Sequence, residues 1–305
     1  MSVAVCDTTL PGFIGRPIDA TAGRLLSSAP AVDFSQPAGE SSLVDADSVS
    51  WRIFKNPVAL FIGGVTAVIL ELAEPRVRAG VWDHSSFRTD PLRRLQRTGM
   101  AAMVTVYGAK SDAERMIAGV VRMHGKVTGQ ASTGQTYSAN DVDLLDWVQA
   151  TASFGFISAY DAYVRRLSPS DTDRAYAEAA PAAKLYGALG APTSAREMTA
   201  LTARMTPSLE PSPVLAEFLT IMRTADIAPG PLKPLQSLLI RAAVELAPLH
   251  LQRRLGLEGQ GLKSWQRPLV HAAAATADRV RLDSSPAVQA CLRLGLPAGY
   301  LYRSA

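Results

Sequence analysis

His124 is the side chain in this sequence that is best suited to bind a metal. It lies in the stretch VVRMHGKVTG, inside a helix that we predict from Ser111 to Gly129. A buried histidine needs a partner for each ring nitrogen, and a metal is one such partner. The alternative is a core histidine satisfied by a backbone carbonyl or a carboxylate, and the helical wheel alone favours that alternative. On the wheel, His124 shares an apolar face with Ala113, Met116, Ile117, Val120 and Val127.

A second group of polar side chains lies on the preceding predicted helix, which begins at Pro91 and stops at Gly108. Arg94, Arg97 and Thr98 fall on one stripe of this helix at helical spacing. The stripe is either a solvated face or a cationic wall that could hold an anionic group. Because the connection GAKSD is short, we expect the two helices to be antiparallel neighbours, with the histidine and the wall lining one cavity.

The other three histidines have less specific surroundings. His84 lies in the loop DHSSFRTDP, and an iron site made of Asp83, His84 and His124 is a conceivable alternative. His250 and His271 are interpreted as structural or surface residues. The sequence contains no GxSxG, P-loop, GxGxxG or HExxH motif, so none of these established catalytic classes is indicated.

The elements that must position these residues are helices. Apolar helical patterns follow one another from Trp51 onward, and no stretch shows the sustained alternation of a sheet. The most apolar stretch, Val58 to Ala73, is interpreted as a buried core helix that Pro57 opens; a membrane-dipping segment is the alternative. We therefore predict an all-α protein with about a dozen helices. Its helix starts are marked by Asp90-Pro91, Ser111 with Glu114, Ser138 with Asp141, Ser168-Pro169, and Ser194 with Glu197.

The composition is compatible with a single large helical domain. The 305 residues are 48% hydrophobic, and we divide them into a loose N-terminal arm, 1–48, that wraps the domain or stays mobile, and a helical domain, 49–305. The net charge of +4 is too evenly spread for a nucleic-acid partner but suits an anionic small ligand or a membrane surface. Cys6 and Cys291 form no disulfide or zinc pattern, and the N-terminus shows no secretory signal. A cytoplasmic protein, at most peripheral to a membrane, is expected.

Five stretches occur in an order that resembles the latex clearing protein and MpaB-type oxygenase family: GVWDHSSF, DPLRRLQRT, VYG, VRMHGKVTG and YSANDVDLLDWV. The resemblance runs from about Trp51 to Gly190 and continues more faintly to the C-terminus. Members of this family are all-α proteins that hold a b-type haem through one axial histidine. The latex clearing protein cleaves carbon–carbon double bonds of polyisoprene with O2, and the MpaB branch cleaves a prenyl side chain.

The resemblance implies roles for the residues named above. His124 corresponds to the axial haem ligand, and Arg94, Arg97 and Thr98 correspond to an R-x-x-K-T pocket motif. Arg97 departs from the rubber-cleaving branch, which has lysine there; arginine stays protonated and is a poor iron ligand, which argues against rubber as the substrate. Arg94 is then expected to anchor a haem propionate. Arg97 and Thr98 are expected to stabilise negative charge on bound O2, and His84 either contacts a propionate or closes its own loop by a hydrogen bond.

The sequence and the resemblance together predict a haem b-dependent oxygenase whose pocket lies between helices, as in globins. We expect it to act with O2 on an apolar substrate, for example an isoprenoid or a lipid. The alternative from another class is a non-catalytic helical protein that binds haem or lipid, and a third possibility is a branch that has lost haem. Consumption of O2 separates the first two, and the colour of the purified protein tests the third.

Overall fold

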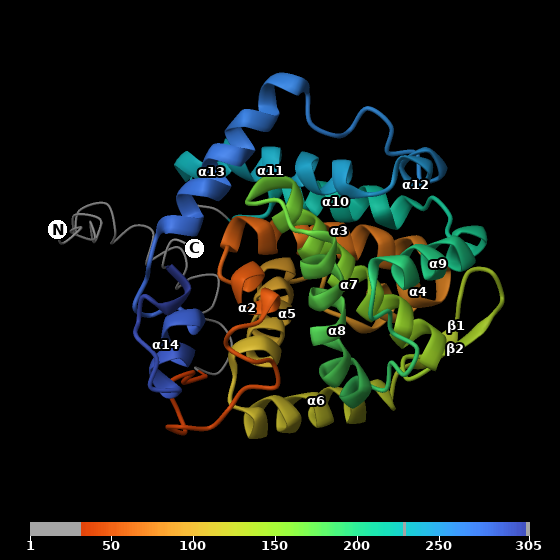
Figure 1. The fold of residues 1–305 in the computed structure, drawn as a ribbon. Coiled ribbons are helices and arrows are strands. Elements are labelled where there is room, and N and C mark those ends of the chain that lie inside the picture. Colours follow the sequence, from red (N-terminus) through yellow and green to blue (C-terminus); the bar gives the residue numbers. More distant parts are fainter. Residues whose placement is uncertain (1–31, 228–229, 303–305) are drawn as a thin grey trace.

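The computed structural model describes residues 32–227 and 230–302. Within them it contains thirteen α-helices and one small two-stranded sheet, so the all-α prediction is confirmed (Figure 1). The α-helices are α2 Val49–Phe54, α3 Pro57–Ala73, α4 Pro75–His84, α5 Pro91–Tyr107, α6 Lys110–His124, α7 Val142–Tyr163, α8 Pro169–Tyr186, α9 Ala195–Met205, α10 Pro213–Thr224, α11 Lys233–Leu246, α12 Leu249–Arg254, α13 Arg267–Arg279 and α14 Pro286–Arg293. Short 3₁₀ turns are η1 Thr206–Ser208, η2 Gly230–Leu232, η3 Ser264–Gln266 and η4 Tyr300–Tyr302, and the strands are β1 Thr128–Gln130 and β2 Thr136–Ser138.

Helix α3 is the central element of the fold. It begins as predicted at Pro57, and the Asn56 side chain caps it by accepting the N–H groups of the first turn. Helix α7 crosses it so closely that the two backbones touch: a Cβ placed on Gly63 would lie 2.7 Å from the Gly155 carbonyl oxygen. Only glycine allows this approach, and the contact fixes α7 against α3.

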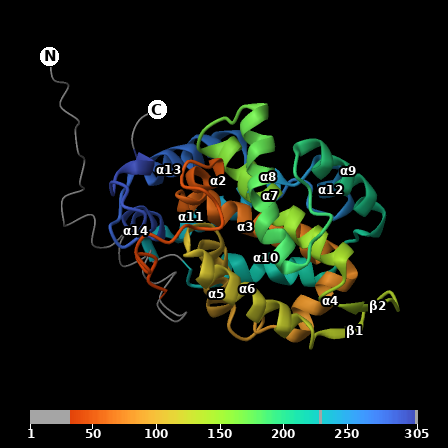
Figure 2. The same ribbon diagram turned by 60° about the horizontal axis from the view of Figure 1, so that its bottom comes forward.

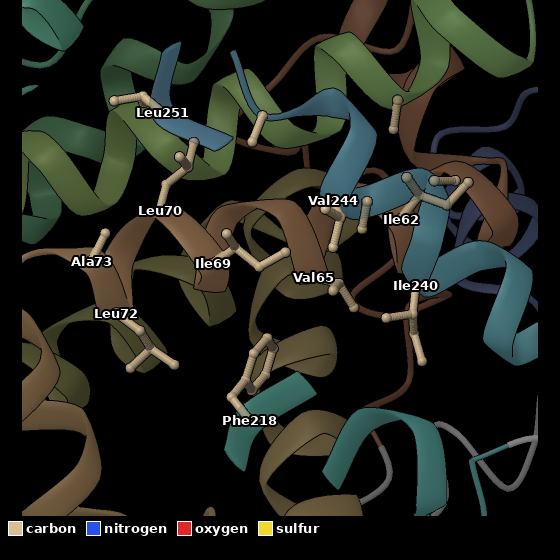
Figure 3. Packing of buried hydrophobic residues seen from close by; sticks show 14 of the residues in the cluster. Ile62, Val65, Ile69, Leu70, Leu72, Ala73, Phe218, Ile240, Val244 and Leu251 are labelled. Atoms are coloured by element: carbon tan, nitrogen blue, oxygen red, sulfur yellow. The ribbon is translucent and has the colours of Figure 1, made fainter. Parts of the chain in front are cut away.

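Apolar side chains from the C-terminal helices cover another part of α3. Most of the helix is buried, as expected for a core helix rather than a membrane segment. Figure 3 shows Ile62, Val65 and Ile69 of α3 among side chains from later helices. Those partners include Phe218 of α10, Ile240 and Val244 of α11 and Leu251 of α12.

The chain bends sharply after α3, where Pro75 begins the next helix. Glu74 is buried at the bend, and its side chain caps α4 by accepting the Val77 N–H at 2.8 Å. In the described part of the chain no single helix is long and apolar enough to cross a membrane. The pair α3 and α4 reaches that length and composition only together, across a bend of 111°.

Several predicted helix starts are confirmed, because local side chains cap them. Asp90, Ser168 and Ser194 each accept a backbone N–H of the first turn of α5, α8 and α9. In each case the capping group and the first turn are close in sequence, so the local pattern is sufficient to place the start.

Two predicted caps are wrong: Ser111 is engaged by a residue distant in sequence, and Ser138 lies in a strand before the helix. Helix α6 begins at Lys110 without a side-chain cap, and Ser111 instead pairs with the carboxylate of Glu40, 2.6 Å from its backbone nitrogen. Ser138 does not open α7; it ends strand β2, and its N–H donates to Asp141 Oδ2 at 2.9 Å. Helix α7 starts after Asp141 without a side-chain hydrogen bond at its cap.

The helix that carries His124 is shorter than predicted. It ends at His124 rather than near Gly129, because Gly125 to Val127 form a turn and strand β1 follows. Strand β1 pairs antiparallel with β2. This sheet cannot be predicted from the sequence, since strands of three residues are too short to show an alternating pattern.

Part of the predicted N-terminal arm lies against the helical domain. Residues 32–48 place Phe34 and Val44 in a second apolar cluster with α5 and α14, whereas residues 1–31 lie outside the described part. The buried guanidinium of Arg293 in α14 ties this segment to the end of α5. It donates to the carbonyl oxygens of Phe34 at 2.8 Å, Glu40 at 2.9 Å and Tyr107 at 2.7 Å.

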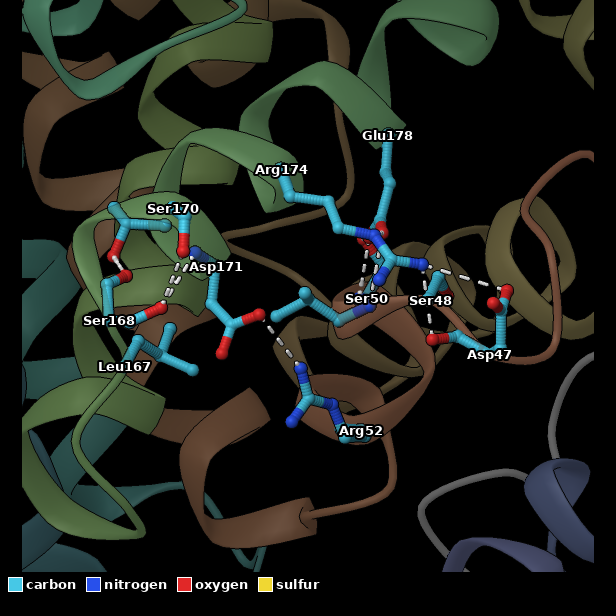
Figure 4. Close-up of polar contacts among 12 residues, drawn as sticks. Asp47, Ser48, Ser50, Arg52, Leu167, Ser168, Ser170, Asp171, Arg174 and Glu178 are labelled. Carbon is cyan, nitrogen blue, oxygen red and sulfur yellow. Dashed lines mark hydrogen bonds and ion pairs between the residues drawn. The ribbon is translucent and has the colours of Figure 1, made fainter.

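Charged side chains of α8 bind the N-terminal end of α2 (Figure 4). Glu178 accepts the backbone N–H groups of Val49 at 3.1 Å and Ser50 at 2.9 Å, and Arg174 pairs with Glu178 at 2.8 Å. A carboxylate is favourable at a helix N-terminus, where free N–H groups gather. Since α2 leads directly into α3, these bonds help to fix the central helix.

Candidate active site

His124 lies at the C-terminal end of α6 with a half-buried side chain. Ala113 and Ile117, on its predicted apolar face, are buried, so this face points into the domain. Of the two ring nitrogens, only Nδ1 is a fully buried atom without a hydrogen-bond partner within the described residues. Nε2 is not among these buried, unpartnered atoms.

The surroundings keep His124 uncharged. Burial lowers the pKa of its ring, and the positive charge of Arg94 lowers it further. A neutral imidazole has a free lone pair, which is the form that binds a metal. The same effect shows that Arg94 of α5 lies close to His124 of α6, as the predicted juxtaposition of the two helices requires. In Figure 1, α6 runs along the lower edge of the molecule, below α5, and Figure 2 also shows the two helices side by side.

Arg94 is the inner member of the predicted cationic wall. Its side chain is half-buried, and burial lowers its pKa, with Glu71 opposing that effect and Arg97 adding to it. The Thr98 hydroxyl meets the Arg94 guanidinium and also donates to the Arg94 carbonyl oxygen at 3.0 Å. Arg97 and Thr98 themselves are exposed. The cationic wall thus runs from the half-buried side chain of Arg94 to the exposed side chain of Arg97.

Glu71 is the residue at this site that the sequence analysis missed as a functional candidate. It comes from the last turn of α3, and burial raises the pKa of its carboxyl to about 7. Arg94 and the hydroxyl of Thr151, which donates to Oε1 at 3.4 Å, oppose that rise without cancelling it. Glu71 can therefore exchange a proton near neutral pH. The available signal was a single carboxylate in an otherwise apolar core helix.

One face of α3 is less tightly covered than the rest, although the helix is central. Four residues on it remain half-buried among fully buried neighbours, and they recur at helical spacing. The face points toward α7, because a Cβ on Gly64 would lie 3.9 Å from the Phe156 ring. It also points toward α5, because the positive charge of Arg94 acts on the carboxyl of Glu71. We call it the α3 stripe; its members are Phe61, Gly64, Val68 and Glu71.

These residues fit a haem better than a metal bound by protein ligands alone. Within residues 32–227 and 230–302, no three side chains of the His, Cys, Asp and Glu types gather as a metal site, so Asp83, His84 and His124 do not form the alternative iron centre. A non-haem iron site needs about three protein ligands, whereas haem iron needs only one histidine. The α3 stripe supplies an apolar wall and Arg94 a cation for a carboxylate. The donor set is therefore compatible with haem.

The remaining histidines lie apart from this arrangement. His84, the last residue of α4, is exposed, and the neighbouring Asp83 acts electrostatically on Tyr137 of the hairpin. His250 is exposed on α12. His271 is also exposed and lies 3.2 Å from the Tyr163 carbonyl oxygen through Nδ1, as a structural residue would.

Comparison with known families agrees with this geometry. Residues 51–280 match the family model described as "ER-bound oxygenase mpaB/B'/Rubber oxygenase, catalytic domain". The match includes every helix that contributes to the candidate site, from α3 to α7. No curated protein and no solved structure matches the chain significantly.

Proposed function

The chain belongs to the mpaB and rubber oxygenase family and is an oxygenase, and from this premise we propose that it uses a b-type haem held by His124. The observation that carries the proposal is a half-buried histidine whose neutral form is favoured by burial and by the nearby half-buried cation Arg94. The α3 stripe is connected to this site through Glu71, which acts electrostatically on Arg94. Haem would supply the activation of O2.

We assign to Arg94 the binding of an anionic group, such as a haem propionate. Its side chain is half-buried, and partial removal from solvent strengthens a charge-assisted hydrogen bond. Thr98 holds that guanidinium by its hydroxyl contact. His84 stays a proposed propionate contact; its exposed position on α4 offers no second argument for that role.

The proton chemistry falls to Glu71. Because the pKa of this carboxyl is raised to about 7, both its protonated and its ionised forms are populated near neutral pH. We propose that Glu71 takes or returns a proton while substrate is bound, with Thr151 orienting the carboxylate. Arg97 and Thr98, at the exposed end of the wall, would stabilise negative charge that develops on oxygen.

The substrate class proposed is apolar, for example an isoprenoid or a lipid-like molecule. The half-buried Phe61 and Val68 of the α3 stripe can contact such a chain without polar groups that would reject it. The proposal includes a cytoplasmic location with at most peripheral contact to a membrane. The mildly basic chain, with a pI near 9.2, is compatible with an anionic membrane surface.

The experiment combines spectroscopy with oxygen uptake. The full chain, produced with sufficient iron, should show a Soret band and a pyridine-haemochrome spectrum of b type. With a soluble polyprenol as the probe, it should consume O2 and form carbonyl products, and free hemin at the same concentration sets the baseline. A colourless protein that does not take up hemin contradicts the cofactor. A haem protein that consumes no O2 with any apolar probe contradicts the proposed activity.

A further inference from the structure

Two buried polar atoms near the end of α6 have no hydrogen-bond partner. They are Nδ1 of His124 and Oδ1 of Asn140, and the one other such atom among the described residues belongs to Glu245 of α11. An unsatisfied buried donor or acceptor costs roughly 1–3 kcal/mol, so such atoms are rare in folded proteins. One of the two is a ring nitrogen that can carry a proton, and the other is an acceptor, so each could supply what the other lacks.

Asn140 lies over the turn of α6 on which the His124 side chain rests. Its Nδ2 donates to the Val121 carbonyl oxygen at 3.3 Å, and a Cβ on Gly125 would lie 3.7 Å from that same Nδ2. Helical side chains lean toward the N-terminus and cover the preceding turn. The imidazole of His124 therefore covers the part of α6 to which the Asn140 amide is anchored.

The segment before α7 holds Asn140 in this position. Its backbone N–H donates to Ser138 Oγ at 3.2 Å, and the Ser138 N–H donates to Asp141 Oδ2 at 2.9 Å. Because Nδ2 is hydrogen-bonded to the Val121 carbonyl oxygen, the orientation of the Asn140 amide plane is also fixed. Oδ1 is thus presented from a constrained turn rather than from a mobile side chain.

We propose that Asn140 is a positioning residue for His124, whose Nδ1–H donates to Asn140 Oδ1 after a small side-chain rotation. This bond keeps the proton on Nδ1 and leaves the lone pair of Nε2 for the metal. Histidine ligands generally donate their second N–H to a carbonyl or carboxylate in this way, which fixes the tautomer and the ring orientation. The inference rests on the proposed function, since it explains how His124 is prepared to bind haem iron.

The first test reads the tautomer in the full chain without haem. Nitrogen-15 NMR of histidine-labelled protein distinguishes a proton on Nδ1 from one on Nε2, and His124→Gln identifies the signal among the four histidines. We expect the Nδ1–H form in the wild type and in Asn140→Asp, and a shift toward the Nε2–H form in Asn140→Leu. A wild-type His124 with its proton on Nε2, or an Asn140→Leu spectrum like that of the wild type, would overturn the inference.

The second test uses the haem-loaded protein and a control variant. Asn140→Leu should lower the iron–histidine stretching frequency of the ferrous form and speed hemin release by about tenfold or more, whereas Asn140→Asp should raise that frequency. Ser138→Ala removes a bond of the same turn but leaves Oδ1 in place, so it should keep the wild-type frequency. Equal shifts in Ser138→Ala and Asn140→Leu would mean that only the fold of the turn matters, and would refute the inference.

The two proposals fail in different ways. If the wild type binds hemin through His124 but Asn140→Leu changes neither the tautomer nor the frequency, the proposed function stands and the role of Asn140 is wrong. If the wild type binds no hemin, the proposed function fails, whatever the tautomer of His124 is.

Discussion

Replacing Glu71 with glutamine should make the protein more stable at high pH and leave it nearly unchanged at low pH. Glu71 has an ordinary pKa of 4.5, and burial raises it to about 7 in the folded protein. The native state therefore binds this proton more tightly than the unfolded chain does. Stability from this group is fully present below pH 4.5, falls as the pH rises toward 7, and is lost above that value.

The size of the effect follows from the two pKa values. At about 1.4 kcal/mol for each pKa unit, the rise from 4.5 to about 7 corresponds to roughly 3 to 4 kcal/mol. Glu71→Gln removes this cost above pH 7, so its free energy of unfolding should exceed that of the wild type by at most about 3 to 4 kcal/mol. The value is an upper bound, because the substitution also deprives Arg94 of a nearby negative charge.

The assay is urea unfolding of the haem-free full chain between pH 4 and 9, for the wild type and Glu71→Gln. The difference in the free energy of unfolding should grow with pH and level off above about pH 8. Glu217→Gln is the matched control, since Glu217 is exposed and pairs with Arg88 at the surface. It should change stability by less than about 1 kcal/mol at any pH. A difference for Glu71→Gln that does not vary with pH would refute the assignment of a raised pKa.

Three further predictions concern the contacts around the site. Gly155→Ala should lower stability by about 1–3 kcal/mol in urea unfolding, because its Cβ would clash with the Gly63 carbonyl oxygen. An unchanged midpoint would contradict the close crossing of α3 and α7. Arg94→Ala should speed the loss of hemin to apomyoglobin. Arg97→Ala should retain haem and lower the turnover of O2 about ten- to a hundredfold. Equal effects of the two substitutions would contradict the different roles assigned to Arg94 and Arg97. Arg293→Ala should lower the free energy of unfolding by ~3 kcal/mol and increase proteolysis of residues 32–48. Resistance to proteolysis equal to that of the wild type would show that other contacts hold this segment.

Local sequence signals predicted those parts of the fold that depend on neighbours along the chain. The starts of α5 and α8 followed from Asp90 and Ser168, because a capping side chain lies within three residues of the N–H group it accepts. The start of α6 was misplaced, because Ser111 is engaged by Glu40, which lies 71 residues away in the sequence. No local pattern reveals a partner at that distance.

The site was predictable to a similar degree. His124 and Arg94 were found from helical spacing and from the resemblance to a family, and the structure places them close together. Glu71 is not marked as functional by the sequence, because its altered pKa depends on burial by helices from elsewhere in the chain. Asn140 gave no signal, since an asparagine before a helix is ordinary and its unpaired Oδ1 is visible only in three dimensions.

The most direct test of the account is a hemin titration of the full chain and of four single histidine-to-alanine variants. We predict that His124→Ala loses the saturable Soret band and the b-type haemochrome, while the variants of His84, His250 and His271 bind hemin with the same stoichiometry and spectrum as the wild type. If His124→Ala binds hemin as the wild type does, with an unchanged spectrum, His124 is not the iron ligand and the proposed active site is wrong.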